Sequence, residues 1–111
     1  MGTLYAHSHA EYFNVIKSST GYPLIASIIN PSVTTLPMVN PTFRIYEMDS
    51  QTYELLDFVD YRMDVNKSNK ERKAYWYEAL RFTEYFNVSS ISAYNIDQII
   101  KNSNVALLFI K

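Results

Sequence analysis

The hydrophobic pattern divides the chain into two parts with different periods. Residues 11–64 alternate short apolar runs with proline, glycine and asparagine, which predicts β-strands separated by turns. The run PLIASIIN at residues 23–30 is almost continuously apolar over the length of one strand, as is typical of a strand buried on both faces. The segments FRIYEMD and YELLDFVDYRMD, joined by SQT, predict a hairpin rich in aromatic and branched residues.

The segment between these strands is rich in proline. Residues 31–41, PSVTTLPMVNP, contain Pro31, Pro37 and Pro41. Proline has no N–H to donate to a ladder and biases the preceding residue toward an extended conformation. We therefore predict an ordered loop here, rather than a strand or a helix.

From Ser68 onward the apolar residues repeat at helical spacing. Ser68 and Glu71 form an S-x-x-E capping box, which predicts a helix over residues 68–86. We interpret its aromatic stripe as a face packed on a sheet rather than a binding surface, because such stripes are usually core. The stripe comprises Tyr75, Ala79, Phe82 and Phe86, with Trp76 on its flank.

A second helix is predicted after Ser90 or Ser92, carrying Ile96, Ile99 and Ile100. The last segment, NVALLFIK, is apolar and has the character of an element cut short. Strands followed by helices make the expected fold class α+β.

Composition narrows the classes of function. The chain has 111 residues, 48% of them hydrophobic, and a net charge of −1, so it is too apolar for disorder and lacks the basic footprint of a nucleic-acid binder. It has no cysteine, which excludes disulfides and thiolate metal sites. No apolar run is long enough to cross a membrane, and no signal peptide is visible.

Both histidines of the chain, His7 and His9, lie two positions apart. In an extended segment their imidazoles share a face, whereas on a bent loop they can serve two adjacent metal ions. The imidazole nitrogen suits zinc. Glu11 is interpreted as a surface carboxylate, with a role as a ligand or as an acceptor for an imidazole N–H as the alternative.

Other candidate groups make no complete site. The carboxylates Asp57 and Asp60 lie in the predicted hairpin and are expected to be solvated. No nucleophile elbow, glycine-rich phosphate loop or nucleotide fingerprint occurs. Sequons at Asn66 and Asn87 permit N-glycosylation if the protein is secreted.

Three stretches together resemble one known family. They are AHSHAEYFNVI, PLIASIINPSVTTLPMVNPTFRIYEMD and YWYEALRFTEYFNVSSISAYNIDQI. Their order and spacing resemble the C-terminal part of acid sphingomyelinase-like phosphodiesterases, in the calcineurin-like metallophosphoesterase superfamily. That family carries G-H-T-H, then P-S-V-T-T, then N-P-x-[FY]-R-[IV]-Y, and NPSVTTLPMVNPTFRIY is the most specific match.

The resemblance implies a fold and a chemistry. It implies the C-terminal part of an αββα sandwich, with strands and the last metal-ligand loop in residues 1–64 and a helical, truncated region in residues 65–111. His7 and His9 become ligands of a two-zinc centre, one on each ion, which activates water and neutralises the phosphodiester. The expected substrate is sphingomyelin or a related phosphodiester, and the expected location is secreted or lysosomal.

Departures from the family pattern limit what is carried over. The glycine before the first histidine is Ala6, and Leu36 replaces a tyrosine that lines the substrate site in the family. The loop carrying Thr34, Thr35, Leu36 and Asn40 is expected to close the substrate cleft. The family's upstream D-x-H, G-D and G-N-H-[DE] ligands are absent.

Because each zinc requires about four ligands, we expect this chain to be inactive and marginally folded on its own, with its strands forming one sheet of an incomplete sandwich. Two alternatives remain. One is a stand-alone, non-catalytic module that binds a protein or a membrane surface, and the other is a phosphodiesterase that acts on nucleotides.

Overall fold

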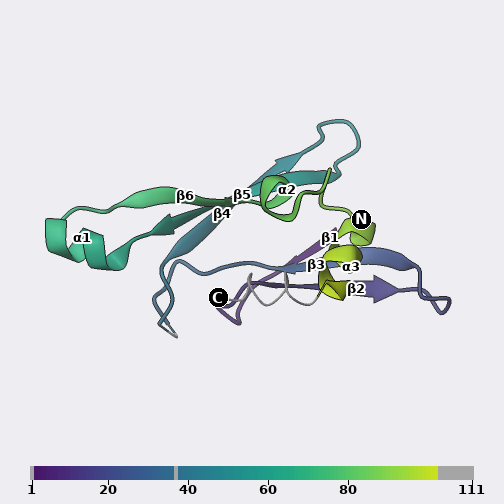
Figure 1. Cartoon of the computed structure of the whole chain (residues 1–111), viewed down its shortest axis with the longest axis horizontal. Helices are drawn as coiled ribbons and strands as arrows, with labels where there is room; N and C mark the ends of the chain where they lie inside the picture. The colour runs from purple at the N-terminus through teal and green to yellow at the C-terminus, as the bar shows by residue number, and fades with distance from the viewer. Residues whose placement is uncertain (1, 37, 103–111) are drawn as a thin grey trace.

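The computed structural model of the chain describes residues 2–36 and 38–102, and the predicted C-terminal segment NVALLFIK lies outside them. The described residues form an α+β fold, which confirms the expected class (Figure 1). The strands are β1 Gly2–Tyr5, β2 Tyr12–Lys17, β3 Pro23–Ile29, β4 Thr42–Met48, β5 Leu55–Met63 and β6 Trp76–Arg81. The helices are α1 Val65–Glu71, α2 Phe82–Phe86 and α3 Ala93–Lys101.

The strands form two sheets, so the expectation of a single sheet is wrong. The first sheet has the order β1-β3-β2, with β1 parallel and β2 antiparallel to β3. The second has the order β4-β5-β6 and is antiparallel throughout. The predicted hairpin is confirmed as β4 and β5, and residues 31–41 form the predicted loop, without regular structure among those described. This loop carries the chain from one sheet to the other.

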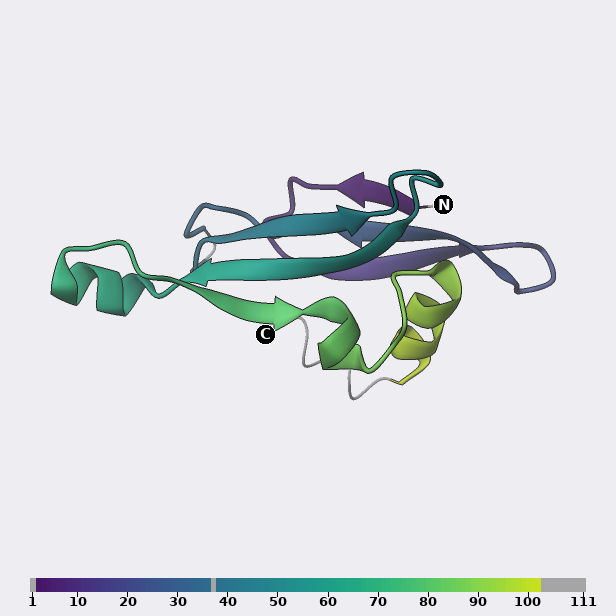
Figure 2. The same cartoon turned by 90° about the horizontal axis from the view of Figure 1, so that it is seen from above.

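The hydrophobic core lies between the sheets and two helices. Phe58 of β5 contacts Phe13 of β2 across the sheets and Phe82 of α2, with ring centroids 6.5 and 5.0 Å apart. Helix α3 packs on β2 and β3 and lies on the same side of the strands as α2 (Figure 2). Residues 26–29 of β3 are all buried, as predicted for the continuous apolar run. The clustered core side chains are Ala26, Ile28, Phe58, Phe82, Ile91, Ile96 and Ile99.

The single helix predicted over residues 68–86 is wrong. Helix α1 begins earlier, where the Asp64 carboxylate accepts a hydrogen bond from Lys67 N, and it ends at Arg72 in the left-handed region. The chain then extends as β6, which pairs with β5, before the short helix α2. Ser68 accepts from Tyr75 N instead of capping a helix. Pairing with β5 outweighs the local helical period, and the aromatic stripe is therefore divided between two elements.

The second predicted helix is confirmed as α3. Of the two predicted caps, Ser92 is the one used, and its hydroxyl accepts from Asn95 N at 3.0 Å. Ile96 and Ile99 are buried as the period predicts, whereas Ile100 is exposed.

An arm projects from the two-sheet body (Figures 1 and 2). We define the arm as residues 64–78, which comprise α1, the turn after it and the start of β6. The arm lies at one end of the long axis of a molecule measuring 53 × 31 × 25 Å. None of the helices in the described part of the chain is long and apolar enough to cross a bilayer.

Candidate functional site

Both histidines lie in the loop that connects β1 to β2. His7 has φ 92° and His9 has φ 58°, so the loop is bent rather than extended. Of the two geometries considered for a His-x-His pair, this backbone matches the bent loop. A non-glycine residue in the left-handed region costs about 1–2 kcal/mol, and such conformations concentrate at functional sites.

The His9 ring is fixed by the loop of residues 31–41. Its Nδ1 lies 3.0 Å from the carbonyl oxygen of Leu36. Because a carbonyl only accepts, this contact requires a proton on Nδ1, and the neutral ring then carries its lone pair on Nε2. Metal-binding imidazoles are commonly oriented in this way by a carbonyl behind them.

His9 and His7 do not assemble a full ligand set. Within residues 2–36 and 38–102, no group of three or more histidine, cysteine, aspartate or glutamate side chains is placed to hold a metal ion. A structural or catalytic zinc takes three or four protein ligands. The described residues therefore offer at most part of a metal site.

Glu11 is not the surface carboxylate that we expected. Its side chain is only 14% exposed, and its oxygens accept from Arg44 Nη2 at 2.6 Å and from Arg62 Nη2 at 3.3 Å. The hydrogen bonds described for its two oxygens thus come from guanidinium groups rather than from an imidazole. Glu11 joins the histidine loop to the strands of the second sheet.

Behind Glu11, Arg44 and Asp60 form a buried ion pair. Arg44 Nε and Nη2 donate to the two Asp60 oxygens at 2.6 and 2.8 Å, and the side chains are 2% and 1% exposed. The Arg44 guanidinium also lies 3.6 Å from the centroid of the Phe58 ring. Fork-shaped pairing satisfies both carboxylate oxygens in an apolar surrounding. The pair holds β4 and β5 in register on the face that meets the first sheet.

The expectation that Asp57 and Asp60 are solvated is wrong. Both are buried because β5 is the central strand of its sheet. Asp57 accepts from the backbone N–H and the hydroxyl of Thr83 at 3.0 and 2.8 Å, and from Arg81 at 3.1 Å. It anchors α2 to the second sheet.

Burial has the largest single effect on the pKa values of Glu11 and Arg44. It raises the pKa of Glu11 to about 7, and the negative charge of Asp60 adds to the rise while Arg44 opposes it. Burial alone would lower the pKa of Arg44, but its hydrogen bonds to Asp60 raise it instead. Arg44 therefore stays charged, whereas Glu11 holds a proton in mildly acidic solution.

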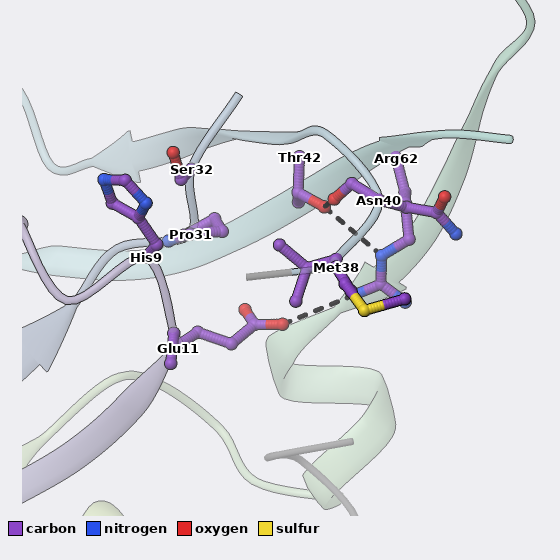
Figure 3. A pocket seen from close by; sticks show the side chains of 10 residues that line it. His9, Glu11, Pro31, Ser32, Met38, Asn40, Thr42 and Arg62 are labelled. Atoms are coloured by element: carbon purple, nitrogen blue, oxygen red, sulfur yellow. Dashed lines mark hydrogen bonds and ion pairs between the residues drawn. The ribbon is translucent and has the colours of Figure 1, made fainter. Parts of the chain in front are cut away.

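A cavity of about 210 Å³ lies beside His9 (Figure 3). The histidine loop, the loop of residues 31–41 and β5 all contribute to its wall. Arg62 reaches it from β5, donating from Nε to Thr42 Oγ1 at 3.2 Å. The described lining residues are His9, Ala10, Glu11, Pro31, Ser32, Met38, Val39, Asn40, Thr42 and Arg62.

The residues expected to close a substrate cleft fall into two groups. Asn40 lines the cavity, whereas Thr34, Thr35 and Leu36 are not among its described lining residues. The Thr35 carbonyl accepts from Met38 N and Val39 N, and the Leu36 carbonyl contacts His9. These residues shape the loop and position His9 rather than facing the cavity.

The two sequon asparagines lie away from the cavity. Asn66 is exposed on α1, and Asn87 is exposed at the end of α2. Their glycosylation remains a prediction.

Sequence reasoning missed the arginines of the site. The strand period places Phe58, Asp60 and Arg62 on one face of β5, which the pattern could have shown. The register then sets Arg44 opposite Asp60 and Thr42 opposite Arg62. The sequence alone does not reveal this register, nor does it show that the histidine loop packs against these two strands.

Comparison with known proteins places the chain in a family, although no family model matches it. It is 31% identical over 108 residues to acid sphingomyelinase-like phosphodiesterase 3b of Homo sapiens, covering 89% of this chain and 24% of that protein. It is 30% identical to sphingomyelin phosphodiesterase B of Dictyostelium discoideum, covering 94% of this chain and 18% of that protein. It is also 24% identical to a cyclic GMP-AMP phosphodiesterase of Homo sapiens, covering 81% of this chain and 21% of that protein.

This chain thus spans between 18% and 24% of the length of these relatives. The similarity extends over 94% of this chain in one of them, so it includes the loop of residues 31–41 and the β4–β5 hairpin. The chain belongs to the family of acid sphingomyelinase-like phosphodiesterases, as the motif resemblance predicted.

Proposed function

We propose that this chain supplies two metal ligands, His7 and His9, to a zinc-dependent phosphodiesterase and forms one wall of its substrate cleft. The observation that carries the proposal is the setting of His9. Its Nδ1 is held by the Leu36 carbonyl, and its ring lines the same cavity as Arg62. Phosphodiester hydrolysis at a metal needs ligands held in a fixed orientation, and an arginine beside them can bind the phosphate oxygens.

The donor set fits part of a zinc site. His9 offers Nε2, and His7 is exposed two residues before it. The remaining ligands would come from the part of a full-length relative that this chain does not cover. This chain alone is therefore expected to be inactive. When bound, a zinc pair lowers the pKa of a water molecule and neutralises the phosphodiester oxygens. This chain's own contribution is to orient His9, through Leu36, and to present Arg62 to the phosphate.

The substrate class follows from the relatives. One of the relatives above is named as a sphingomyelin phosphodiesterase, so a sphingomyelin-type or related phosphodiester is proposed. A nucleotide substrate is the second candidate, because one relative is named as a cyclic GMP-AMP phosphodiesterase.

A secreted or lysosomal location and N-glycosylation belong to the same proposal. The exposure of Asn66 and Asn87 supports it. Expression through a secretory pathway should give a protein whose mass falls on treatment with an N-glycosidase. Asn66→Gln and Asn87→Gln should each remove one glycan, and an unchanged mass after treatment of the wild-type protein would refute it.

The exposed apolar surface supports packing against further protein rather than a stand-alone module. Leu24 on β3, Phe43 and Ile45 on β4 are 50%, 39% and 52% exposed. A self-sufficient domain of this size normally covers such side chains on its sheets.

A chimera tests the proposed function. The matching segment of acid sphingomyelinase-like phosphodiesterase 3b is replaced by this chain, and phosphodiesterase activity is measured with zinc present. We expect activity that is lost in His7→Ala and His9→Ala and kept in Ser8→Ala, which retains both imidazoles. A folded chimera whose activity survives both histidine changes would overturn the proposal, as would rapid turnover by this chain alone.

A further inference from the structure

Thr42 lies where several parts of the candidate site meet. It is the first residue of β4, directly after the loop of residues 31–41, and it is only 3% exposed. Its backbone N–H donates to the Ser32 carbonyl at 2.9 Å, which holds the two ends of that loop together. The strand register sets Thr42 opposite Arg62 on β5. Thr42 therefore connects the loop to the arginine that lines the cavity.

The Thr42 hydroxyl forms two hydrogen bonds whose directions are fixed. It donates to the Asn40 carbonyl oxygen at 3.1 Å and accepts from Arg62 Nε at 3.2 Å. A carbonyl oxygen only accepts and a guanidinium only donates, so neither contact can reverse. The χ1 angle of a threonine is also restricted by its branched Cβ. The hydroxyl is therefore a rigid acceptor for Arg62.

The Arg62 guanidinium is held at two of its three nitrogens. Nε donates to Thr42, and Nη2 donates to Glu11 Oε1 at 3.3 Å (Figure 3). Glu11 is itself anchored, because Arg44 donates to its other carboxylate oxygen at 2.6 Å. Contacts at two nitrogens of one planar group determine both its position and the orientation of its plane.

The far end of the guanidinium remains available to a ligand. Among the described residues, none accepts a hydrogen bond from Arg62 Nη1, and the side chain is 32% exposed. Arg62 lines the same cavity as His9. The end of a guanidinium presents two parallel N–H groups, one on each Nη, and this spacing matches two oxygens of a phosphate.

We propose that Thr42 is a positioning residue, which holds Arg62 so that its guanidinium binds two oxygens of the phosphodiester at once. The inference rests on the proposed function, since it takes the ligand of the cavity to be a phosphodiester. Two arginines and two carboxylates make up the buried cluster, so its net charge alone attracts an anion only weakly. The fixed geometry of Arg62, rather than its charge alone, provides the affinity for phosphate.

A positioning role and a purely structural role predict different kinetics. If Thr42 only supported the fold, its loss would reduce the amount of active protein and leave KM unchanged. A displaced Arg62 instead raises KM and changes kcat little, because Arg62 contacts the phosphate in the bound substrate and in the transition state alike.

The chimera described above, loaded with zinc, tests the proposal with bis(p-nitrophenyl) phosphate as substrate. Thr42→Val removes the hydroxyl at constant shape and should raise KM about tenfold, the usual effect of losing a hydrogen bond to a charged group. Thr42→Ser keeps the hydroxyl and should leave KM nearly unchanged. Thr52→Val is the matched control, at an exposed position in the turn between β4 and β5 that does not line the cavity.

Arg62→Lys separates geometry from charge. It keeps the positive charge but not the fork, so it should raise KM as much as Thr42→Val does. The double variant should be no worse than either single variant, because Thr42 acts through Arg62. The dissociation constant of the same phosphodiester for the metal-free chimera, measured by equilibrium dialysis, should rise in parallel.

Several results would overturn the positioning role. They are an equal KM for Thr42→Val and Thr42→Ser, effects that multiply in the double variant, and an unchanged KM in Arg62→Lys. The last of these decides the matter even if Thr42→Val does not fold. Activity that survives the loss of His7 and His9 would refute the proposed function instead, and binding by the metal-free chimera would still test the role of Thr42.

Discussion

Arg44 and Lys70 lie in regions that treat positive charge in opposite ways. Arg44 is buried between the two sheets, where Asp60 and Glu11 accept its hydrogen bonds. Lys70 stands on the arm in solvent, without an acidic partner among the described residues. The first kind of charge is costly to bury and must be paired, whereas the second is fully hydrated and costs the fold almost nothing.

The difference teaches which charges hold the fold together and which do not. The buried cluster connects the histidine loop, β4 and β5, so it determines the position of His9 and Arg62 around the cavity. The arm contributes little to that core. Substitutions should therefore affect stability more in the body than in the arm.

Loss of Arg44 is expected to have the largest effect. Arg44→Ala leaves the Asp60 and Glu11 carboxyls buried without their main donor, which should cost about 3–5 kcal/mol of the free energy of unfolding. Urea denaturation followed by circular dichroism measures it. Lys70→Ala is the control, and a similar small loss in both variants would show that the buried cluster does not hold the sheets together.

Loss of the Asp57 carboxylate should reduce stability by a smaller amount, and this reduction should depend on pH. Burial alone would raise the pKa of Asp57, but hydrogen bonds from Thr83, Phe58 N and Arg81 lower it below its ordinary value of 3.8. The charged form is thus stabilised in the folded state, and its contribution is present above about pH 3.8 and lost as the pH falls through the folded pKa.

Asp57→Asn should therefore reduce stability by about 1–3 kcal/mol at pH 7, because several donors lose a charged acceptor. Thermal unfolding of the wild-type and variant proteins between pH 7 and pH 2.5 checks this. The gap between the two melting temperatures should narrow below about pH 3.8. A constant gap would refute the electrostatic account of this contact.

Removal of the side-chain cap of α3 should reduce stability by less than either of these two substitutions. Ser92→Ala leaves Asn95 N without its side-chain acceptor, at about 1 kcal/mol. Ser89→Ala, at an exposed position that caps no helix, is the matched control. Equal urea midpoints for the two variants would show that the cap does not contribute.

The smallest effect on stability is expected in the arm. Lys70→Gln with Lys73→Gln should change the free energy of unfolding by less than about 0.5 kcal/mol, since both side chains are exposed and form no ion pair with a described residue. The same urea measurement applies. A larger loss would mean that the arm cations take part in the fold, and it would remove the contrast between arm and body.

The strands were predictable where one period dominated. Residues 23–29 and the β4–β5 hairpin follow from apolar runs and alternation, and Ser92 marked α3. The error at residues 68–86 arose because Tyr75, Phe82 and Phe86 fit a helical face while β6 pairs with β5 over long range. Local spacing contains no information about that pairing.

The candidate site was predictable in part for a similar reason. The His-x-His pair and the NPSVTTLPMVNPTFRIY motif identified the family from the sequence itself. The partners of Glu11 were not visible, because Arg44 and Arg62 lie 33 and 51 residues away and meet it only after the two sheets pack.

Metal binding at the histidine loop tests the central claim most directly. Zinc is titrated into the metal-free chimera described above, in which the relative's remaining residues complete the protein, and the bound zinc is counted. We predict that His7→Ala and His9→Ala each lower the zinc content, whereas Ser8→Ala, which retains both imidazoles, does not. A folded chimera whose zinc content is unchanged by both histidine substitutions would contradict the account.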